Sequence, residues 1–276
     1  MWFKGGTSLS KGYGLIQRFS EDLDLKLEPG YVKGIRGVSD WRREGKRMTA
    51  MRREYFENLS QVLSVSGARV HLDVDGADRS WRGAPLQVHY EGRHQADLDA
   101  TMRPYVLLEV GGARVQPWVS CHLSSFVHDE PAVREQAHSY IDNRPRGVRC
   151  VHPLVTLIEK LDAVSRRAVR DDLEPATFVR HYEDAARIIE ARDGLPPLEG
   201  YASVRELVAE MDAEKQIRSV PRSDDGAFSP AIHPAAPQIR AAYEAVSGMY
   251  WGPRMTLNAA GQRIRDWIDS ELSAER

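Results

Sequence analysis

A short strand that carries two aspartates constrains this chain more than any other feature. Asp22-Leu23-Asp24-Leu25 alternates acidic and apolar side chains, and alternate residues of a strand face the same side. Asp22 and Asp24 therefore share one face, while Leu23 and Leu25 point into a core. Two neighbouring carboxylates repel each other unless a cation lies between them, and Mg²⁺ is typically held by one or two carboxylates plus substrate phosphates. The strand therefore predicts a magnesium site.

A glycine-rich segment, Lys4-Gly5-Gly6-Thr7-Ser8-Leu9-Ser10-Lys11, precedes this strand. Glycine lets a backbone approach a ligand closely, and exposed N–H groups can hold phosphate oxygens. A helix that begins near Thr7 would aim its positive dipole end at the same place. The Gly-Lys-Ser/Thr ending of a Walker A loop is absent, and Gly12-Tyr13-Gly14 lacks the third glycine of a Rossmann fingerprint. The alternative without a ligand is a glycine turn beside a solvated acidic strand end.

Together the two segments resemble the nucleotidyltransferase signature, which is Gly-Gly/Ser, a short helix and Asp-x-Asp. Lys-Gly-Gly-Thr-Ser-Leu-Ser-Lys followed by Arg-Phe-Ser-Glu-Asp-Leu-Asp-Leu is closer still to the AbiEii/AbiGii-type toxins of bacterial toxin–antitoxin and abortive-infection systems. The segment 156–161 resembles the Glu-Lys-Leu motif of that family. Arg180-His181-Tyr182-Glu183-Asp184 resembles its Arg-Asp/His-x-Tyr-Asp motif. Family members usually carry a helical segment before the glycine pair, so either the true start lies upstream or this version lacks that segment.

The resemblance implies an α+β fold, with a polymerase-β-like nucleotidyltransferase core in residues 1–150 and an all-helical domain in residues 151–276. Apolar periodicity predicts strands over 22–27, 68–75, 86–90 and 105–110. It predicts helices over 7–18, 39–65 with Ser39 as the N-cap, 175–191, 203–217, 238–248 and 256–272, and a further helix that opens at His152-Pro153. Residues 219–237 are rich in Pro, Ser, Asp and Gly, which is typical of a long mobile loop.

The resemblance also assigns roles to residues. A third carboxylate is expected on a strand beside Asp-x-Asp, and Glu109 in the otherwise apolar strand 105–110 is the candidate. An acid at a strand end that reaches water is the alternative, and Asp97-Leu98-Asp99 is a competing pair without the glycine motif. Asp22, Asp24 and Glu109 would bind two Mg²⁺. The β,γ-phosphates would be held by Gly5, Gly6, Thr7 and Ser8, and the triphosphate neutralised by Lys11, Lys160 and Arg167.

Three residues in the helical part are expected to lie at an active-site cleft. Lys160 and Arg167 lie seven residues apart along the edge of one apolar stripe, so both could reach around a cleft rim. Asp184 would orient a basic group or the base. The alternative is that Lys160 and Asp184 pair with each other or with neighbours on the outside, in a salt-bridged surface helix.

The charge and composition limit the classes of partner that the protein can bind. The net charge is −2, so nucleic-acid binding would need a local basic patch. Such a patch runs from residue 33 to 53 and contains Lys33, Arg36, Arg42, Arg43, Lys46, Arg47, Arg52 and Arg53. A solvated helix face and a phosphate-contacting surface explain it equally well. Two cysteines without Cys-x-x-Cys, no long apolar run and no signal peptide predict a cytosolic protein without membrane contact.

The implied reaction transfers a nucleotide monophosphate from an NTP to an RNA acceptor, notably a tRNA 3′ end, with release of pyrophosphate. A cognate antitoxin is the implied partner. One alternative keeps the chemistry and changes the acceptor to a protein hydroxyl or a small molecule such as an aminoglycoside. Another is a non-catalytic nucleotide- or RNA-binding module, which the presence of Asp22, Asp24 and Glu109 disfavours.

Overall fold

The computed structural model describes residues 1–20, 22–26, 32–92, 103–112, 114–139, 141–170 and 173–273. The chain forms two compact units. Met1–Ser8 and Ser20–Cys150 make up the first, here called the sheet unit. Leu9–Phe19 and Val151–Arg276 make up the second, here called the helical unit. The segment 9–19 therefore belongs with the helical part of the chain, although it follows the glycine pair directly in the sequence.

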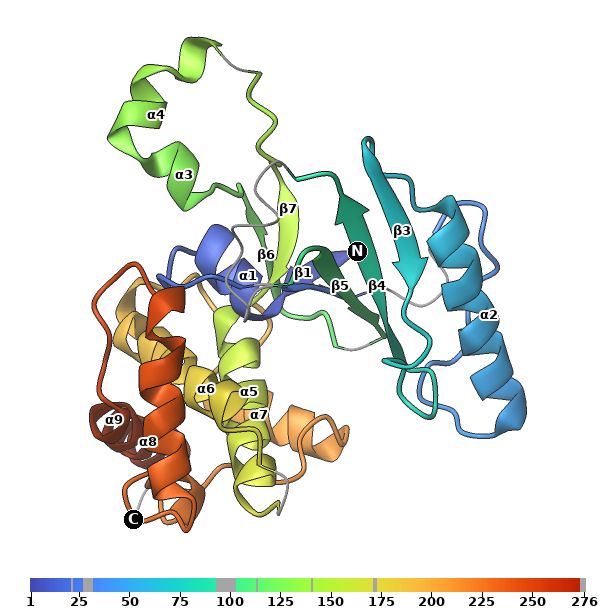
Figure 1. Ribbon diagram of the computed structural model, residues 1–276. Helices are drawn as coiled ribbons and strands as arrows, with labels where there is room; N and C mark the ends of the chain where they lie inside the picture. Colours follow the sequence, from blue (N-terminus) through green and yellow to red (C-terminus); the bar gives the residue numbers. More distant parts are fainter. Residues whose placement is uncertain are drawn as a thin grey trace. The chain divides into compact units, whose positions relative to one another are not determined.

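The sheet unit is built on a mixed sheet that has seven strands within the described residues, in the order β3-β4-β5-β2-β1-β7-β6 (Figure 1). The pairs β2–β5 and β1–β7 are parallel, whereas β1–β2, β3–β4 and β4–β5 are antiparallel. The strands are β1 (Trp2–Lys4), β2 (Asp22–Lys26), β3 (Ala68–Leu72), β4 (Gly83–Tyr90), β5 (Val106–Gly111), β6 (Trp118–Cys121) and β7 (Val148–Val151). This sheet and the helices that follow it in the chain confirm the predicted α+β class.

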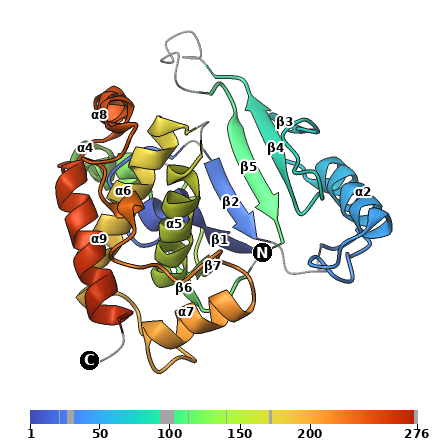
Figure 2. The ribbon, with the colours of Figure 1, turned by 90° about the horizontal axis from the view of Figure 1, so that it is seen from below.

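One apolar core joins the sheet to α2 (Lys46–Val62), which lies along β3 and β4 (Figures 1 and 2). Trp41 packs edge-on against two aromatic rings of α2, with ring centres 5.3 Å from Tyr55 and 5.7 Å from Phe56. Ala84, Leu86 and Val88 of β4 complete the cluster, and Leu23 and Leu25 pack against it as predicted.

The helix predicted over 39–65 begins later than expected, at Lys46. The Asp40 carboxylate accepts the backbone N–H groups of Arg42 and Arg43 at 2.8 and 3.1 Å, which folds this segment into a turn. Gly45 then adopts φ 115°, a left-handed conformation outside any right-handed helix. The predicted N-cap at Ser39 is therefore wrong. Trp41 lies in a loop, but it is buried and its position fits the helical period. The apolar pattern therefore extended the predicted helix too far toward the N-terminus.

The first helix is also shorter than predicted. α1 spans Gly5–Lys11, and the chain leaves the helix through a turn at residues 12 and 13. Arg18 forms an antiparallel bridge with Tyr250, and the Trp251 N–H donates to the Gln17 carbonyl at 3.1 Å. Residues near 17–19 therefore pair with a distant loop of the helical unit, which a local helical pattern could not reveal.

The helical unit packs α5, α8 and α9 around α6, and Figure 2 shows α5, α6 and α9 side by side. Its main helices are α5 (Pro153–Ala168), α6 (Pro175–Glu190), α7 (Val204–Ala213), α8 (Ala236–Ala245) and α9 (Leu257–Glu271). His152 caps α5, because its Nδ1 accepts the Leu154 N–H at 3.1 Å. The segment predicted as a mobile loop contains η4 (Gly226–Phe228), and Phe228 is fully buried. The segment is largely a loop, as predicted, and one aromatic side chain anchors it in the core.

Short helices fill the connection between β6 and β7. They are α3 (Phe126–Asp129), α4 (Pro131–Glu135) and η2 (Ala137–Ser139), and none of them contains a buried residue. Within the part of the chain that the structure describes, no helix has both the length and the apolar character needed to cross a bilayer.

Candidate active site

Three carboxylates lie together on β2 and β5. The parallel pairing of these strands sets Asp24 directly opposite Glu109, and Asp22 shares the face of Asp24 because alternate strand residues point the same way. One carboxylate oxygen from each of Asp22, Asp24 and Glu109 lies within 4.8 Å of the other two. Strand register thus brings together, from distant parts of the sequence, the three residues predicted to bind metal.

The exposure of Glu109 differs from the one that its strand predicts. The apolar strand predicts a buried acid, but Glu109 is exposed, whereas its neighbours Leu108 and Val110 are only 7% and 4% exposed. Loss of hydration, followed by the negative charges of Asp24 and Asp22, raises the pKa of Glu109 to about 7. Glu109 is therefore about half protonated near neutral pH.

Gly5 forms the turn from β1 into α1 and lies against the Asp24 carboxylate. Its φ of 69° is left-handed, and a Cβ atom at this position would lie 1.6 Å from Oδ2 of Asp24. Any larger residue would displace that carboxylate. The first glycine of the pair is therefore required both by the backbone conformation and by the close approach of an acidic side chain.

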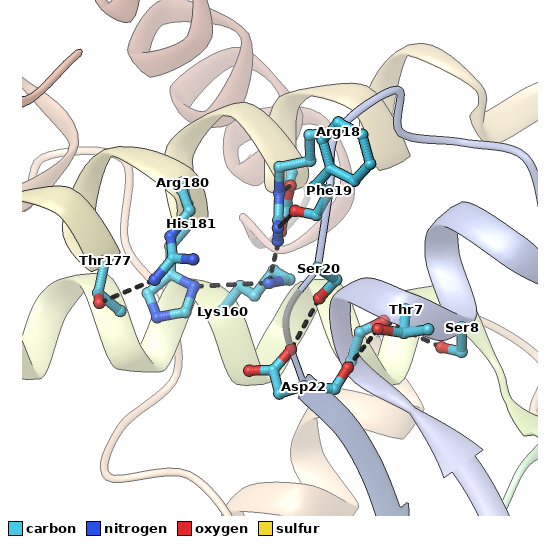
Figure 3. Close-up of polar contacts among 12 residues, drawn as sticks. Thr7, Ser8, Arg18, Phe19, Ser20, Asp22, Lys160, Thr177, Arg180 and His181 are labelled. Atoms are coloured by element: carbon cyan, nitrogen blue, oxygen red, sulfur yellow. Dashed lines mark hydrogen bonds and ion pairs between the residues drawn. The ribbon is translucent and has the colours of Figure 1, made fainter. Parts of the chain in front are cut away.

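Hydroxyl groups fix the start of β2. Ser20 Oγ donates to Oδ1 of Asp22 at 2.7 Å, and Thr7 Oγ1 donates to the Asp22 main-chain carbonyl (Figure 3). Ser8 Oγ donates to the Gly5 carbonyl at 3.0 Å. Gly6, Thr7 and Ser8 are buried, so the two α1 hydroxyls hold the helix and the strand in place. Phosphate contacts by this segment stay a prediction.

In the helical unit, Asp184 on α6 binds two cations. Arg18 donates from Nε to Oδ1 at 2.9 Å and from Nη2 to Oδ2 at 2.7 Å, and Lys160 Nζ lies 2.8 Å from Oδ2. Burial alone would raise the pKa of Asp184, but the charges of Arg18 and Lys160 outweigh it and hold that pKa well below its usual range.

This network corrects two expectations. Asp184 is 1% exposed and Lys160 is 8% exposed, so neither belongs to a surface helix face or to an exposed helix edge. The two residues do pair with each other, as the structural alternative proposed, but the pair is buried. A buried ion pair is costly unless its members are well hydrogen-bonded. Here Arg18 donates two hydrogen bonds to the Asp184 carboxylate in addition to the contact with Lys160.

Sequence reasoning missed Arg18 as a site residue, although it opens the Arg-Phe-Ser-Glu segment that carries the resemblance. Its backbone is held by the bridge to Tyr250, and the next residue, Phe19, donates its N–H to the Met249 carbonyl at 2.8 Å. The Phe19 ring also lies 5.2 Å from the Trp251 ring. This bridged segment therefore aims the Arg18 guanidinium at Asp184 of α6, and the place of Arg18 at the head of the Arg-Phe-Ser-Glu segment was the available signal.

The other predicted cations lie in the helical unit too. Lys11 Nζ lies 5.4 Å from the centre of the Trp251 ring, a cation–π contact. Arg167 Nη1 lies 2.7 Å from Nε2 of His181, a residue that sequence reasoning did not single out. Contacts of Lys11, Lys160 and Arg167 with a triphosphate stay predictions.

The basic stretch near α2 has two kinds of member. Arg52 is fully buried and donates to the carbonyls of Ser80, Trp41 and Arg43 at 2.7, 3.2 and 2.9 Å, so its role is structural. The remaining members are exposed, and they are Lys33, Arg36, Arg42, Arg43, Lys46, Arg47 and Arg53. The competing pair Asp97 and Asp99 lies outside the described residues.

The sheet unit thus offers hard oxygen donors on one face beside a glycine turn, which suits phosphoryl-transfer chemistry. A comparison with protein-family models matches residues 1–263 to the family described as nucleotidyl transferase AbiEii toxin, type IV toxin–antitoxin system. Searches of curated proteins and of solved structures found no match. The matched span includes every site residue described above. The chain is therefore a nucleotidyltransferase and belongs to the AbiEii toxin family.

Proposed function

We propose that this enzyme transfers a nucleoside monophosphate from an NTP to an RNA acceptor, the 3′ end of tRNA, and releases pyrophosphate. The observation that carries the proposal is the meeting of the Asp22, Asp24 and Glu109 carboxylates within 4.8 Å. Membership of a nucleotidyltransferase toxin family supports the reaction class, and the acceptor and a cognate antitoxin follow from the resemblance.

The acidic group fits Mg²⁺. All donors are carboxylate oxygens, which this ion prefers, and Gly5 leaves room beside Asp24 that a side chain would fill. We propose that Asp22, Asp24 and Glu109 hold two ions. When bound, these ions would neutralise charge on the attacking and leaving oxygens of an in-line displacement. Ser20 fixes the Asp22 carboxylate through its 2.7 Å hydrogen bond.

The remaining roles belong to the chain itself. Glu109 lies directly opposite Asp24 and is suited to bind or activate the attacking hydroxyl. Backbone N–H groups at Gly5 and Gly6 would hold phosphate oxygens. Lys11, Lys160 and Arg167 would stabilise negative charge on the triphosphate and on pyrophosphate, and Asp184 would hold Lys160 in position.

The test is transfer of label from each of the four NTPs, labelled at the α-phosphate, to total tRNA in the presence of Mg²⁺. We expect one NTP to label tRNA and to release pyrophosphate in equal amount. Mass spectrometry of the products identifies the acceptor. Label on a protein or an aminoglycoside, with none on tRNA, would replace the RNA proposal by the alternative acceptors, and no Mg²⁺-dependent NTP binding would favour a non-catalytic module.

Binding of Mg²⁺ should release a proton from Glu109. Because the raised pKa of about 7 belongs to an acid, Glu109 is mainly protonated below that pH, and the ion needs the ionised form. Titration calorimetry in buffers of different protonation enthalpy should detect release of about 0.9 proton at pH 6 and about 0.1 at pH 8. The apparent affinity should rise about tenfold across this range. Glu109→Gln should bind more weakly and without proton release, and equal release by both proteins would contradict the assignment.

The exposed cations near α2 offer a surface for the acceptor RNA. Contacts with phosphates give a log–log salt slope of about −0.7 to −0.9 each. Replacing Lys46 and Arg47 together by Gln should therefore flatten the slope of tRNA binding by about 1.4 to 1.8. Lys215 and Arg240, exposed residues of the helical unit, give the matched double Gln control, which should leave the slope unchanged. The same slope in both double variants would identify the α2 cations as a solvated face.

A further inference from the structure

His181 on α6 lies between two positively charged side chains. Its Nδ1 is 3.5 Å from Nζ of Lys160 (Figure 3), and its Nε2 is 2.7 Å from Nη1 of Arg167. Lysine and arginine only donate hydrogen bonds, whereas a neutral imidazole has one acceptor nitrogen and one N–H. One ring nitrogen of His181 can therefore accept from a cation, and the other must present an N–H toward a second donor.

Protonation of the ring cannot resolve this conflict. Burial and the charges of Lys160 and Arg167 hold the pKa of His181 well below its usual range, although Asp184 acts in the opposite direction. The 2.7 Å contact favours Nε2 as the acceptor from Arg167, which leaves the proton on Nδ1. The Nδ1–H and the Lys160 ammonium then converge, 3.5 Å apart, and one oxygen about 2.8 Å from each nitrogen could accept from both.

Charge around His181 is unbalanced. Lys160 is paired with Asp184 at 2.8 Å, whereas the contact of Arg167 with His181 is to a neutral ring. Glu174 attracts Arg167, but no ion pair joins Arg167 to a carboxylate of the described residues, and Arg166, Arg170 and Arg180 add further positive charge. Arg167 is half-buried. A cation partly removed from water without a counter-charge is costly, so an anion would stabilise Arg167.

We propose that Lys160, His181 and Arg167 bind a polyphosphate oxyanion and that His181 sets the strength of this site. The ligand class, pyrophosphate or the β,γ-phosphates of an NTP, rests on the proposed function. An aspartate at this position would supply an internal negative charge to Arg167, whereas histidine leaves that charge to the ligand and adds an N–H donor. His181 therefore determines specificity for a highly charged anion.

The experiment measures binding of inorganic pyrophosphate by calorimetry, and melting temperature, in buffer without divalent cations. We expect His181→Asp to weaken pyrophosphate binding at least about tenfold, which is the loss of about 1.4 kcal/mol, and to raise the melting temperature of the free protein. His181→Gln keeps one neutral donor and one acceptor and should bind within about threefold of the unmodified protein. Arg240→Gln, on an exposed surface, is the control and should change neither value.

Three outcomes would overturn the proposal. The first is equal pyrophosphate affinity for the unmodified protein and the folded His181→Asp variant, and the second is no binding by the unmodified protein. The third is displacement of pyrophosphate by an RNA oligonucleotide without terminal phosphates, with equal affinity and the same dependence on His181. Asp24→Asn separates this proposal from the proposed function, because it should still bind pyrophosphate without metal while it loses nucleotide transfer. Pyrophosphate binding without any transfer activity would overturn the proposed function alone.

Discussion

Asp22→Asn and Asp24→Asn should each lower the turnover of nucleotide transfer about a thousandfold and remove growth inhibition by the toxin. Metal ions supply several kcal/mol of charge stabilisation in such transition states, and each 1.4 kcal/mol or so is a factor of about ten in rate. Either asparagine removes a negative charge from a group whose oxygens lie within 4.8 Å of one another. The measurement is kcat with saturating NTP and tRNA in Mg²⁺.

Stability distinguishes this result from a folding defect. The three carboxylates repel each other without a cation, so neither substitution should lower the melting temperature in metal-free buffer, and both should abolish its increase on addition of Mg²⁺. Asp75→Asn, at an exposed position of the sheet unit, is the matched control and should keep both activity and the response to Mg²⁺. Near-normal turnover by a folded Asp22→Asn or Asp24→Asn protein would remove that residue from the site.

The pairing of Asp22 with Asp24 could be predicted because it depends only on the local geometry of one strand. A strand has a period of two residues, so the shared face of Asp22 and Asp24 follows from their spacing. The position of Glu109 opposite Asp24 is a matter of strand register, which one sequence does not encode visibly, and only the family resemblance pointed to it. Exposure of Glu109 was given only as the alternative, because five apolar neighbours suggested a fully buried strand.

The network in the helical unit was less accessible for a physical reason. Arg18 and Asp184 are separated by 166 positions in the chain, and periodicity places a side chain on a helix face without naming its partner. Lys160 therefore looked like an exposed edge residue, although its partner Asp184 allows it to be buried. Arg52 was predicted to belong to a basic surface patch, because positive charges in a basic stretch are usually exposed. It is buried because backbone carbonyl groups accept its hydrogen bonds.

Asp184→Asn should destabilise the protein more than any other single substitution in this network. It leaves Arg18 and Lys160 buried without a full negative charge, and removal of one partner from a buried ion pair typically costs about 3–5 kcal/mol. For a chain of this size that loss lowers the melting temperature by roughly 10 °C. Lys160→Met should cost less, because Asp184 keeps the two hydrogen bonds from Arg18 at 2.9 and 2.7 Å.

A double variant tests the same ion pair, but here the second substitution should restore stability. Asp184→Asn combined with Lys160→Met removes one of the two cations that Asp184 neutralises, so it should be more stable than Asp184→Asn alone, and the coupling between the substitutions should exceed about 1 kcal/mol. If the losses of stability in denaturant melts were additive, solvent would reach the Lys160–Asp184 pair.

Kinetic measurements separate the contribution of Lys160 to stability from its contribution to catalysis. If Lys160 stabilises charge on pyrophosphate, Lys160→Met lowers kcat at a temperature where the variant is fully folded. An unchanged kcat would leave Lys160 with only the structural task of neutralising Asp184.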